Sequence, residues 1–221
     1  MRFYFSACLV GLGVFLWFPQ LDVVISARFY QPDAGFVYKD VPWVQTLYWL
    51  FARLQIPILI ALVLGLLVAY LRAPWARHRA ALWFLLLSLL LGPGLVVNEA
   101  LKNHWGRARP AHITEFGGEA RYSPPWQISD QCLKNCSMSS GHAALGFYPM
   151  ALGWVWWRRR KTWWLAGGLS GAWVGLGRVL QGGHFVSDVL VSGAVVWGVC
   201  ALLAHLILPR PQAITTPSSP P

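Results

Sequence analysis

Long apolar segments joined by short polar loops dominate this sequence. Six of them can be read as membrane-spanning helices: Phe3–Phe18, Leu54–Leu71, Ala80–Ala100, Ala143–Trp157, Trp163–Val179 and Asp188–Leu208. A helix that crosses a bilayer needs about 20 mostly apolar residues, and the first, fourth and fifth segments are short by this measure. The sequence predicts an all-α membrane protein with six transmembrane helices in a bundle.

Composition supports the membrane assignment. Of the 221 residues, 56% are hydrophobic and 12% are charged, whereas a soluble domain carries about 25% charged residues. The N-terminal segment resembles a signal peptide, with Arg2 before an apolar run, but no small-x-small cleavage site follows, so a retained first span is expected. We predict one integral-membrane domain over residues 1–208 and a disordered cytoplasmic tail, rich in Pro, Ser and Thr, over residues 209–221.

The loops of the predicted bundle alternate in charge. One set holds basic residues and no acids: Arg2, Arg72, Arg77, Arg79, Arg158, Arg159, Arg160, Lys161 and Arg210. All eight acids fall on the other side or at its membrane boundary: Asp22, Asp33, Asp40, Glu99, Glu115, Glu119, Asp130 and Asp188. Basic residues in short loops mark the cytoplasmic side, so both termini are predicted inside. The net charge of +10 can orient the chain or bind an anionic substrate, and its placement in short loops disfavours nucleic-acid binding.

Three polar segments far apart in the chain all fall on the predicted outer side. They are residues 102–110 (KNHWGRARP), 139–142 (SSGH) and 178–188 (RVLQGGHFVSD). The residues of interest in them are three cations, two histidines, a Ser-Gly turn and a carboxylate. Each feature alone would be an interfacial polar group, a surface anchor or a turn. Their occurrence on one membrane face predicts a site that handles phosphate.

These residue types suit the transfer of a phosphoryl group. Positioned cations and backbone N–H groups stabilise its charge, and Lys102, Arg109 and Arg178 can supply the cations. Ser140 and Gly141 precede the fourth predicted span, where a helix N-terminus would offer free N–H groups to an anion.

The remaining polar residues can supply the chemistry. His184 and Asp188 are four residues apart and would share a helix face if the sixth span starts nearby, so that the carboxylate fixes the tautomer of a nucleophilic imidazole. His142 can then act as the general acid. His142, His184 and Asp188 could also ligate zinc, but three neighbouring cations would repel a divalent ion, so no metal is expected.

The order Lys-x6-Arg-Pro, Ser-Gly-His, Arg-x5-His-x3-Asp resembles that of the type 2 phosphatidic acid phosphatase superfamily, which also includes vanadium haloperoxidases. The resemblance covers the chain from about Asn98 to Asp188. It implies that the phosphate is bound by Lys102, Arg109, Arg178, Ser140 and Gly141. It implies that His184 forms a phosphohistidine, that His142 is the acid, that Asp188 orients His184, and that no cofactor is needed.

Two positions depart from the family pattern. Ser139 stands where the family usually has Pro, and Gly177 stands where it usually has Ser before the arginine. Neither position supplies an essential group, so activity is expected to survive. The phrases GPGLVVNEALKNHWGRARP and QCLKNCS resemble those of bacterial lipid A phosphatases, the 1-phosphatases in particular, and of related phosphotransferases.

The resemblance implies a multi-pass lipid phosphatase of a bacterial inner membrane, with its active site facing the periplasm and a phosphorylated lipid as its partner. Lipid A 1-phosphate is the favoured substrate, with undecaprenyl pyrophosphate and phosphatidylglycerophosphate as competitors. Two other hypotheses are a phosphotransferase that passes the phosphoryl group to a second lipid, and a lipid transporter or scramblase with a vestigial phosphate site.

Four further expectations concern the surroundings of the site. Cys132 and Cys136 would form a disulfide in an oxidising periplasm, the alternative being two free thiols. Gly167, Gly171 and Gly175 permit close helix approach, within the bundle rather than between two copies. The aromatic-rich stretch Leu21–Arg53 is expected to lie along the membrane interface. Further candidates for contact with the site are Glu99, for one of its cations, and His104, Arg107 and His112, for the substrate head group.

Overall fold

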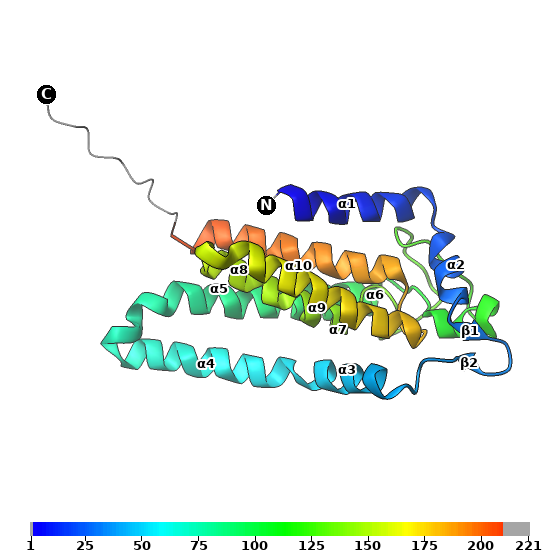
Figure 1. The fold of residues 1–221 in the computed structure, drawn as a ribbon, viewed down its shortest axis with the longest axis horizontal. Coiled ribbons are helices and arrows are strands. Elements are labelled where there is room, and N and C mark those ends of the chain that lie inside the picture. The colour runs from blue at the N-terminus through cyan, green and yellow to red at the C-terminus, as the bar shows by residue number, and fades with distance from the viewer. Residues whose placement is uncertain (1, 210–221) are drawn as a thin grey trace, which may run out of the picture.

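The computed structural model describes residues 2–209, with the side chains of residues 10–209, and this part of the chain is mostly helical (Figure 1). The longer helices are α1 (Arg2–Trp17), α3 (Pro42–Arg53), α4 (Gln55–Leu71), α5 (Arg79–Leu89), the π-helix η2 (Leu90–Leu101), α9 (Arg160–Leu180) and α10 (Val186–Ile207). Shorter ones are α2 (Leu21–Ala27), α6 (Lys102–His104), α7 (Gly141–Phe147) and α8 (Leu152–Val155). Strands β1 (Tyr30–Gln31) and β2 (Gly35–Phe36) form a small antiparallel hairpin. The predicted tail lies, apart from Pro209, outside the described residues.

Helices occupy each of the six predicted spans, but they differ in how well they suit a membrane. Among the described residues, three stretches are long and apolar enough to cross one: Pro42–Leu71, Ala73–His104 and Val186–Ile207. The pair Val10–Trp17 and Leu21–Ala27, bent by 95°, would add a fourth as a broken span. The fourth predicted span is interrupted, because Pro149 begins a 3₁₀ turn between α7 and α8.

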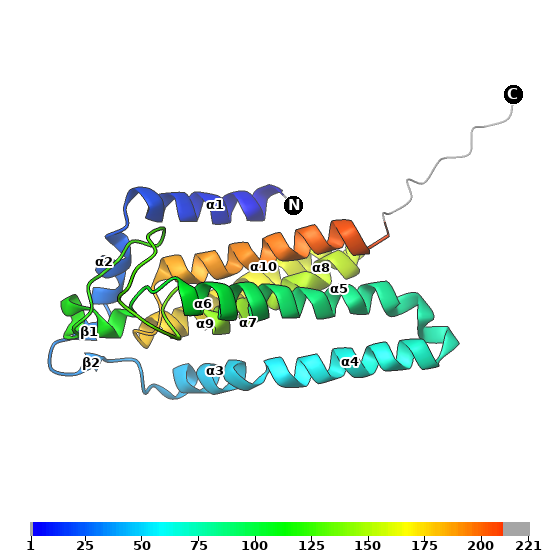
Figure 2. The same cartoon turned by 180° about the vertical axis from the view of Figure 1, so that it is seen from behind.

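Helix α3 continues α4 over residues that were expected to lie along the membrane interface. Val41 is extended, and Pro42 then starts α3 at a position where its missing N–H is no loss. Figures 1 and 2 show α3 in line with α4, so the two form one long rod. The inner side of α3 packs on α7 and α9 and reaches the candidate site.

Close packing of α9 fixes the centre of the bundle. A Cβ added to Gly167 would overlap Met150, one added to Gly171 would overlap Phe147, and one added to Gly175 would overlap Val189. The glycine stripe therefore packs against neighbouring helices of the same chain, as predicted. This arrangement holds the end of α9 close to the start of α7.

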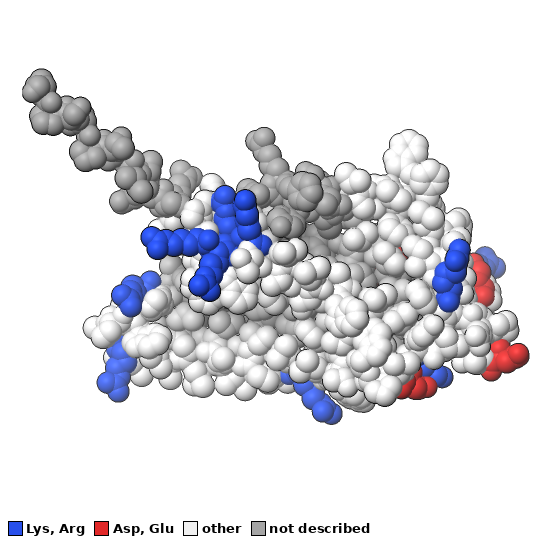
Figure 3. Space-filling model, in the orientation of Figure 1, with Lys and Arg blue, Asp and Glu red and all other residues white. Residues whose placement is uncertain are grey.

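One end of the bundle carries the polar segments. Helix α2, the hairpin and the long loop between α6 and α7 lie together there (Figures 1 and 2). A small apolar cluster that includes Phe36, Ile113, Phe116 and Phe185 packs beneath these loops. Figure 3 shows acidic side chains at this end and a group of basic side chains at the opposite end.

Candidate functional site

The three predicted polar segments meet at this end of the bundle. Lys102 begins α6, Arg109 follows in an extended segment, and Ser140, Gly141 and His142 form the start of α7. Arg178 lies in the last turn of α9, His184 in the loop that follows, and Asp188 in the first turn of α10. Residues far apart in sequence thus surround one site, as predicted.

His184 is fully buried at the centre of this site. Its Nδ1 lies 2.6 Å from the carbonyl oxygen of Ser137, which can only accept a hydrogen bond, so Nδ1 donates. In the neutral ring this leaves a lone pair on Nε2, which is buried and has no partner among the described residues. Burial, reinforced by the positive charges of Arg178, Lys102 and Arg109, holds the pKa of His184 well below its ordinary value. The side chain is therefore a neutral imidazole with a free nitrogen.

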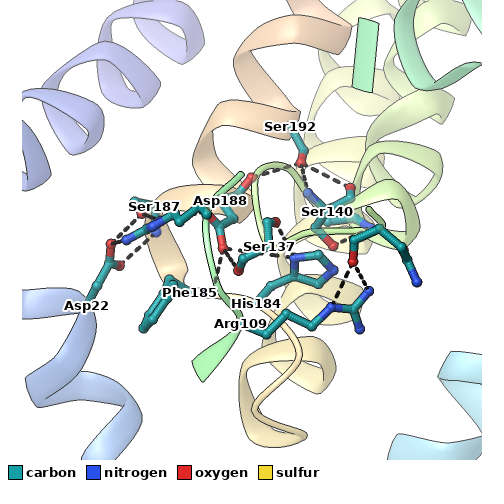
Figure 4. Close-up of polar contacts among 12 residues, drawn as sticks. Asp22, Arg109, Ser137, Ser140, His184, Phe185, Ser187, Asp188 and Ser192 are labelled. Atoms are coloured by element: carbon teal, nitrogen blue, oxygen red, sulfur yellow. Dashed lines mark hydrogen bonds and ion pairs between the residues drawn. The ribbon is translucent and has the colours of Figure 1, made fainter. Parts of the chain in front are cut away.

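Asp188 contacts His184 less directly than predicted. Its Oδ2 lies 3.9 Å from Nδ1 of His184, too far for a hydrogen bond. That oxygen instead accepts from Oγ of Ser137 at 2.5 Å and from the backbone N–H of Phe185 at 2.8 Å. The shared helix face is also absent, because α10 begins at Val186, two residues after His184. Figure 4 shows His184 turned toward Ser137 and Asp188 on the other side of Ser137.

His142 lies in the first turn of α7 and stacks on Tyr48 of α3. The ring centroids are 4.8 Å apart and the planes differ by 19°. Within the described part of the chain, Nε2 of His142 is buried without a hydrogen-bond partner. Two buried imidazole nitrogens, one on His142 and one on His184, thus lack partners in the same site.

Tyr48 is a site residue that sequence reasoning missed. Besides His142, its ring contacts Arg178, whose guanidinium carbon is 4.9 Å from the ring centroid. The available signal was the spacing of Val44, Tyr48 and Phe51, which puts three bulky side chains on one face of a helix. Val44 is buried and Phe51 packs against the main core, so this face points inward.

The guanidinium groups of Arg109 and Arg178 are held by neighbouring groups. Arg109 donates from Nε and from one terminal nitrogen to the carbonyl of Asn135, at 3.1 and 2.7 Å. Arg178 donates to the side chain of Gln181 and lies against Gly183, where a Cβ would overlap the guanidinium group. Burial lowers the pKa of Arg109, as expected for a cation partly removed from water.

Ser140 and Gly141 lie at the start of α7 as predicted, but their backbone N–H groups differ in whether they already have an acceptor. The N–H of Ser140 donates to Oγ of Ser192 at 2.9 Å, and Oγ of Ser140 accepts from the N–H of Ala143 at 3.4 Å. Gly141 is the first residue of the helix, where N–H groups have no acceptor within the helix. Of the two N–H groups, that of Gly141 is the better placed for an anion.

A disulfide closes a short loop beside Arg109. The structure joins Cys132 to Cys136, with Cα atoms 5.7 Å apart. Inside the loop, the N–H of Asn135 donates to the side-chain oxygen of Asn103 at 3.3 Å, and the N–H of Cys136 donates to the carbonyl of Lys102 at 2.9 Å. These contacts hold the Asn135 carbonyl against Arg109.

Arg107 was a candidate for contact with the substrate head group, but its contacts lie elsewhere. Its side chain is completely buried and forms ion pairs with Asp22 and Asp188. His104 and His112 are exposed, and His104 contacts the carbonyl of Glu99 at 3.0 Å. The Glu99 side chain accepts from Asn103 at 3.1 Å rather than from a cation of the site. Within residues 2–209, no group of three or more His, Cys, Asp or Glu is arranged to hold a metal ion.

Comparisons with known proteins match this chain to one family profile and to several lipid A phosphatases. A family profile described as the PAP2 superfamily matches residues 81–212. The chain is 36% identical over 206 residues to a lipid A 4'-phosphatase of Francisella tularensis subsp. novicida (strain U112), covering 89% of this chain and 92% of that protein. It is 36% identical over 148 residues to a lipid A 4'-phosphatase of Rhizobium leguminosarum, covering 60% of this chain and 64% of that protein. No solved structure gives a significant match.

Proposed function

The chain belongs to the PAP2 superfamily and is a membrane phosphoric monoester hydrolase, and from this premise we propose that it is a lipid A 4'-phosphatase that works through a phosphohistidine. The observation that carries the proposal is His184, a neutral buried imidazole whose free Nε2 is surrounded by three cations. A group of this kind suits attack on a negatively charged phosphorus centre.

The 4' position replaces the 1-phosphate that the sequence alone favoured. Relatives named as lipid A 4'-phosphatases support it, including one that aligns over most of both chains. The residues around His184 would contact the phosphate group itself, so they do not distinguish the 4' position of the sugar from the 1 position. The choice between positions therefore rests on the relatives, and the experiment below addresses it directly.

The proposed reaction has two steps. Nε2 of His184 attacks phosphorus, the bond from phosphorus to the sugar oxygen breaks, and His142 gives its proton to that oxygen. Water then attacks the phosphohistidine, His142 takes a proton from the water, and free phosphate leaves with His184 neutral again. Lys102, Arg109, Arg178 and the Gly141 N–H stabilise the phosphoryl oxygens, and the dianionic phosphate offsets the three cations while His142 holds the proton.

We further propose six membrane-crossing helices in a bacterial inner membrane, with both termini cytoplasmic and the site facing the periplasm. Acidic side chains at one end and a group of basic side chains at the other support this orientation (Figure 3). Single cysteines at Glu119 and Arg159, introduced into a variant without the four native cysteines, test it with a membrane-impermeant maleimide. We expect labelling of intact spheroplasts only at position 119, and the reverse pattern would overturn the orientation.

The central experiment measures phosphate release by the purified protein in detergent with a chelator present. The substrates are bisphosphorylated lipid A, undecaprenyl pyrophosphate and phosphatidylglycerophosphate, and mass spectrometry identifies which lipid A phosphate is lost. We expect loss of the 4'-phosphate, abolished in His184→Ala and His142→Ala, and kept in the matched control His104→Ala, whose side chain is exposed.

Each other outcome has a defined meaning. If lipid A loses only its 1-phosphate, the assignment to the 4' position is overturned and the 1-phosphate favoured from the sequence is restored as the substrate. Full activity of His184→Ala would overturn the phosphohistidine mechanism. Consumption of lipid A without free phosphate, with a second lipid phosphorylated, would show a phosphotransferase. If no lipid is hydrolysed or phosphorylated, the lipid transporter is the hypothesis that remains.

A further inference from the structure

Arg107 lies between two predicted phosphate-binding cations in the chain but points away from them. Its side chain is 0% exposed. One terminal nitrogen donates to Oδ1 of Asp188 at 2.5 Å, and the other donates to Oδ2 of Asp22 at 2.9 Å. A cation paired with two carboxylates has little charge left for a substrate anion.

The rest of the guanidinium group is also committed. Nε donates to the carbonyl of Ser123 at 2.8 Å, and the nitrogen that contacts Asp188 also donates to Oγ of Ser187 at 2.9 Å. The guanidinium carbon lies 4.3 Å from the ring centroid of Phe185. An arginine has five N–H donors in a rigid fork, and here contacts from several separate segments fix that fork. Turning it toward the substrate would break two buried ion pairs.

We propose that Arg107 and Asp22 are positioning residues that hold Asp188 and, through Ser137, the nucleophile His184; this rests on the proposed function of His184. The connection is continuous. Arg107 fixes one carboxylate oxygen of Asp188, the other receives the hydroxyl hydrogen bond of Ser137, and the Ser137 carbonyl receives the Nδ1–H of His184. Displacing the Asp188 carboxylate shifts the Ser137 peptide and with it the imidazole.

Asp22 extends this chain of contacts into a part of the molecule outside the family match. It lies in α2, whereas the match covers residues 81–212. Besides Arg107, it accepts from the backbone N–H of Ser187 at 3.0 Å and from the Ser187 hydroxyl. Figure 4 shows Asp22 and Ser187 side by side next to the start of α10. The α2 segment therefore belongs to the machinery that positions the site.

The test compares Arg107→Lys, Asp22→Asn and Ser137→Ala with wild type on whichever phosphorylated lipid the wild type hydrolyses. For a positioning role we expect kcat to fall about tenfold or more, because small displacements of reacting groups have effects of this size. We expect the KM and the inhibition constant of inorganic phosphate to stay near their wild-type values. If Arg107→Lys instead raises both constants while kcat stays unchanged, Arg107 binds phosphate and the proposal is overturned.

The matched control is Arg121→Gln, which removes an exposed arginine from the same loop region. We expect it to keep wild-type kinetics, while Arg107→Gln, which leaves two buried carboxylates without a cation, loses more activity than Arg107→Lys. Adding Asp22→Asn to Arg107→Gln removes one of those carboxylates and should restore part of kcat. If the losses of activity caused by Arg107→Gln and Asp22→Asn simply add in the double variant, the two residues are not coupled and the proposal is contradicted.

A readout without substrate separates this proposal from the proposed function. In protein labelled with 15N-histidine, the two ring nitrogens of His184 report which one carries the proton. We expect the Nδ1-protonated form in wild type and a perturbed or mixed signal in Ser137→Ala and Asp22→Asn. An unchanged signal and unchanged kcat in both variants would overturn the proposal, even if Arg107→Gln failed to fold. If the wild type hydrolysed no lipid, the signal alone would still decide it.

Discussion

The ring of Tyr48 lies almost parallel to the imidazole of His142, with centroids 4.8 Å apart, while Arg178 covers the same tyrosine at 4.9 Å. Tyr48 thus contacts both the proposed general acid and one of the proposed phosphate-binding cations. The contacts are made by the faces of the ring. The orientation of His142 therefore depends on an aromatic side chain from α3.

Replacing this ring tests its role. We expect Tyr48→Ala to lower kcat about tenfold, because His142 loses the surface that fixes its plane. Tyr48→Phe keeps the ring and should retain most of the activity, which makes it the matched variant. Both are measured by phosphate release, with thermal unfolding in detergent as the folding control. Equal losses in the two variants would assign the effect to the hydroxyl group.

Replacing Gly183 by alanine should disturb the candidate site without a large loss of stability. A methyl group there would overlap the end of the Arg178 side chain, which is flexible and can move away. We expect Gly183→Ala to raise KM and lower kcat/KM about tenfold while the melting temperature stays close to that of wild type. Gly168→Ala in α9 is the control, because nothing lies within 4 Å of its added Cβ. A large drop in melting temperature in Gly183→Ala alone would point to a fold defect.

The protonation of His184 should respond to pH in a defined direction. Burial and the neighbouring cations hold its pKa well below 6.5, so the ring stays neutral and nucleophilic through the neutral range and gains a proton only in more acidic solution. In Arg178→Gln one positive charge is lost, and the pKa should rise toward 6.5. The titration is followed by 15N NMR of the free enzyme, because a phosphate ester itself titrates with a pKa of about 6. Protonation of wild-type His184 at or above pH 6.5 would contradict the neutral site.

The disulfide loop should matter for Arg109. In Cys132→Ser we expect kcat/KM to fall several-fold, because the Asn135 carbonyl is no longer held against the guanidinium group. Closing a loop of this size stabilises a protein by about 2 kcal/mol, so the melting temperature should fall as well. Dithiothreitol should reproduce both effects in wild type and add nothing in Cys132→Ser. Full activity after confirmed reduction would show that Arg109 does not need the loop.

The helical ranges and the convergence of the polar segments could be predicted from sequence, because each depends on local patterns. Apolar runs between basic loops indicated the helices, and the charge rule put Lys102, His142 and His184 at the same end. Residues 42–53 were not expected to continue the second predicted span, because Gln45, Thr46 and Arg53 lower the apolar content of α3. That helix is amphipathic, and the spacing of Val44, Tyr48 and Phe51 was the sequence signal for its inward face.

The errors within the site arose from partners distant in sequence. Arg107 was a candidate for contact with the substrate head group, and nothing near it in the chain indicated Asp22, which is 85 residues away. The spacing of His184 and Asp188 fitted a helix, but α10 starts between them, so Ser137 rather than Asp188 receives the imidazole hydrogen bond. Side-chain direction in a loop depends on tertiary contacts that spacing does not encode.

The contact between Asp22 and Ser187 joins residues 165 positions apart. Contacts of such long range form only after most of the chain has been made, so α2 and α10 must both be in place before this network is complete. A partly synthesised chain that lacks α10 also lacks Ser187 and Asp188, so the polar network that ends at His184 cannot yet form. The proposed active site is therefore completed only when the last helix has been made.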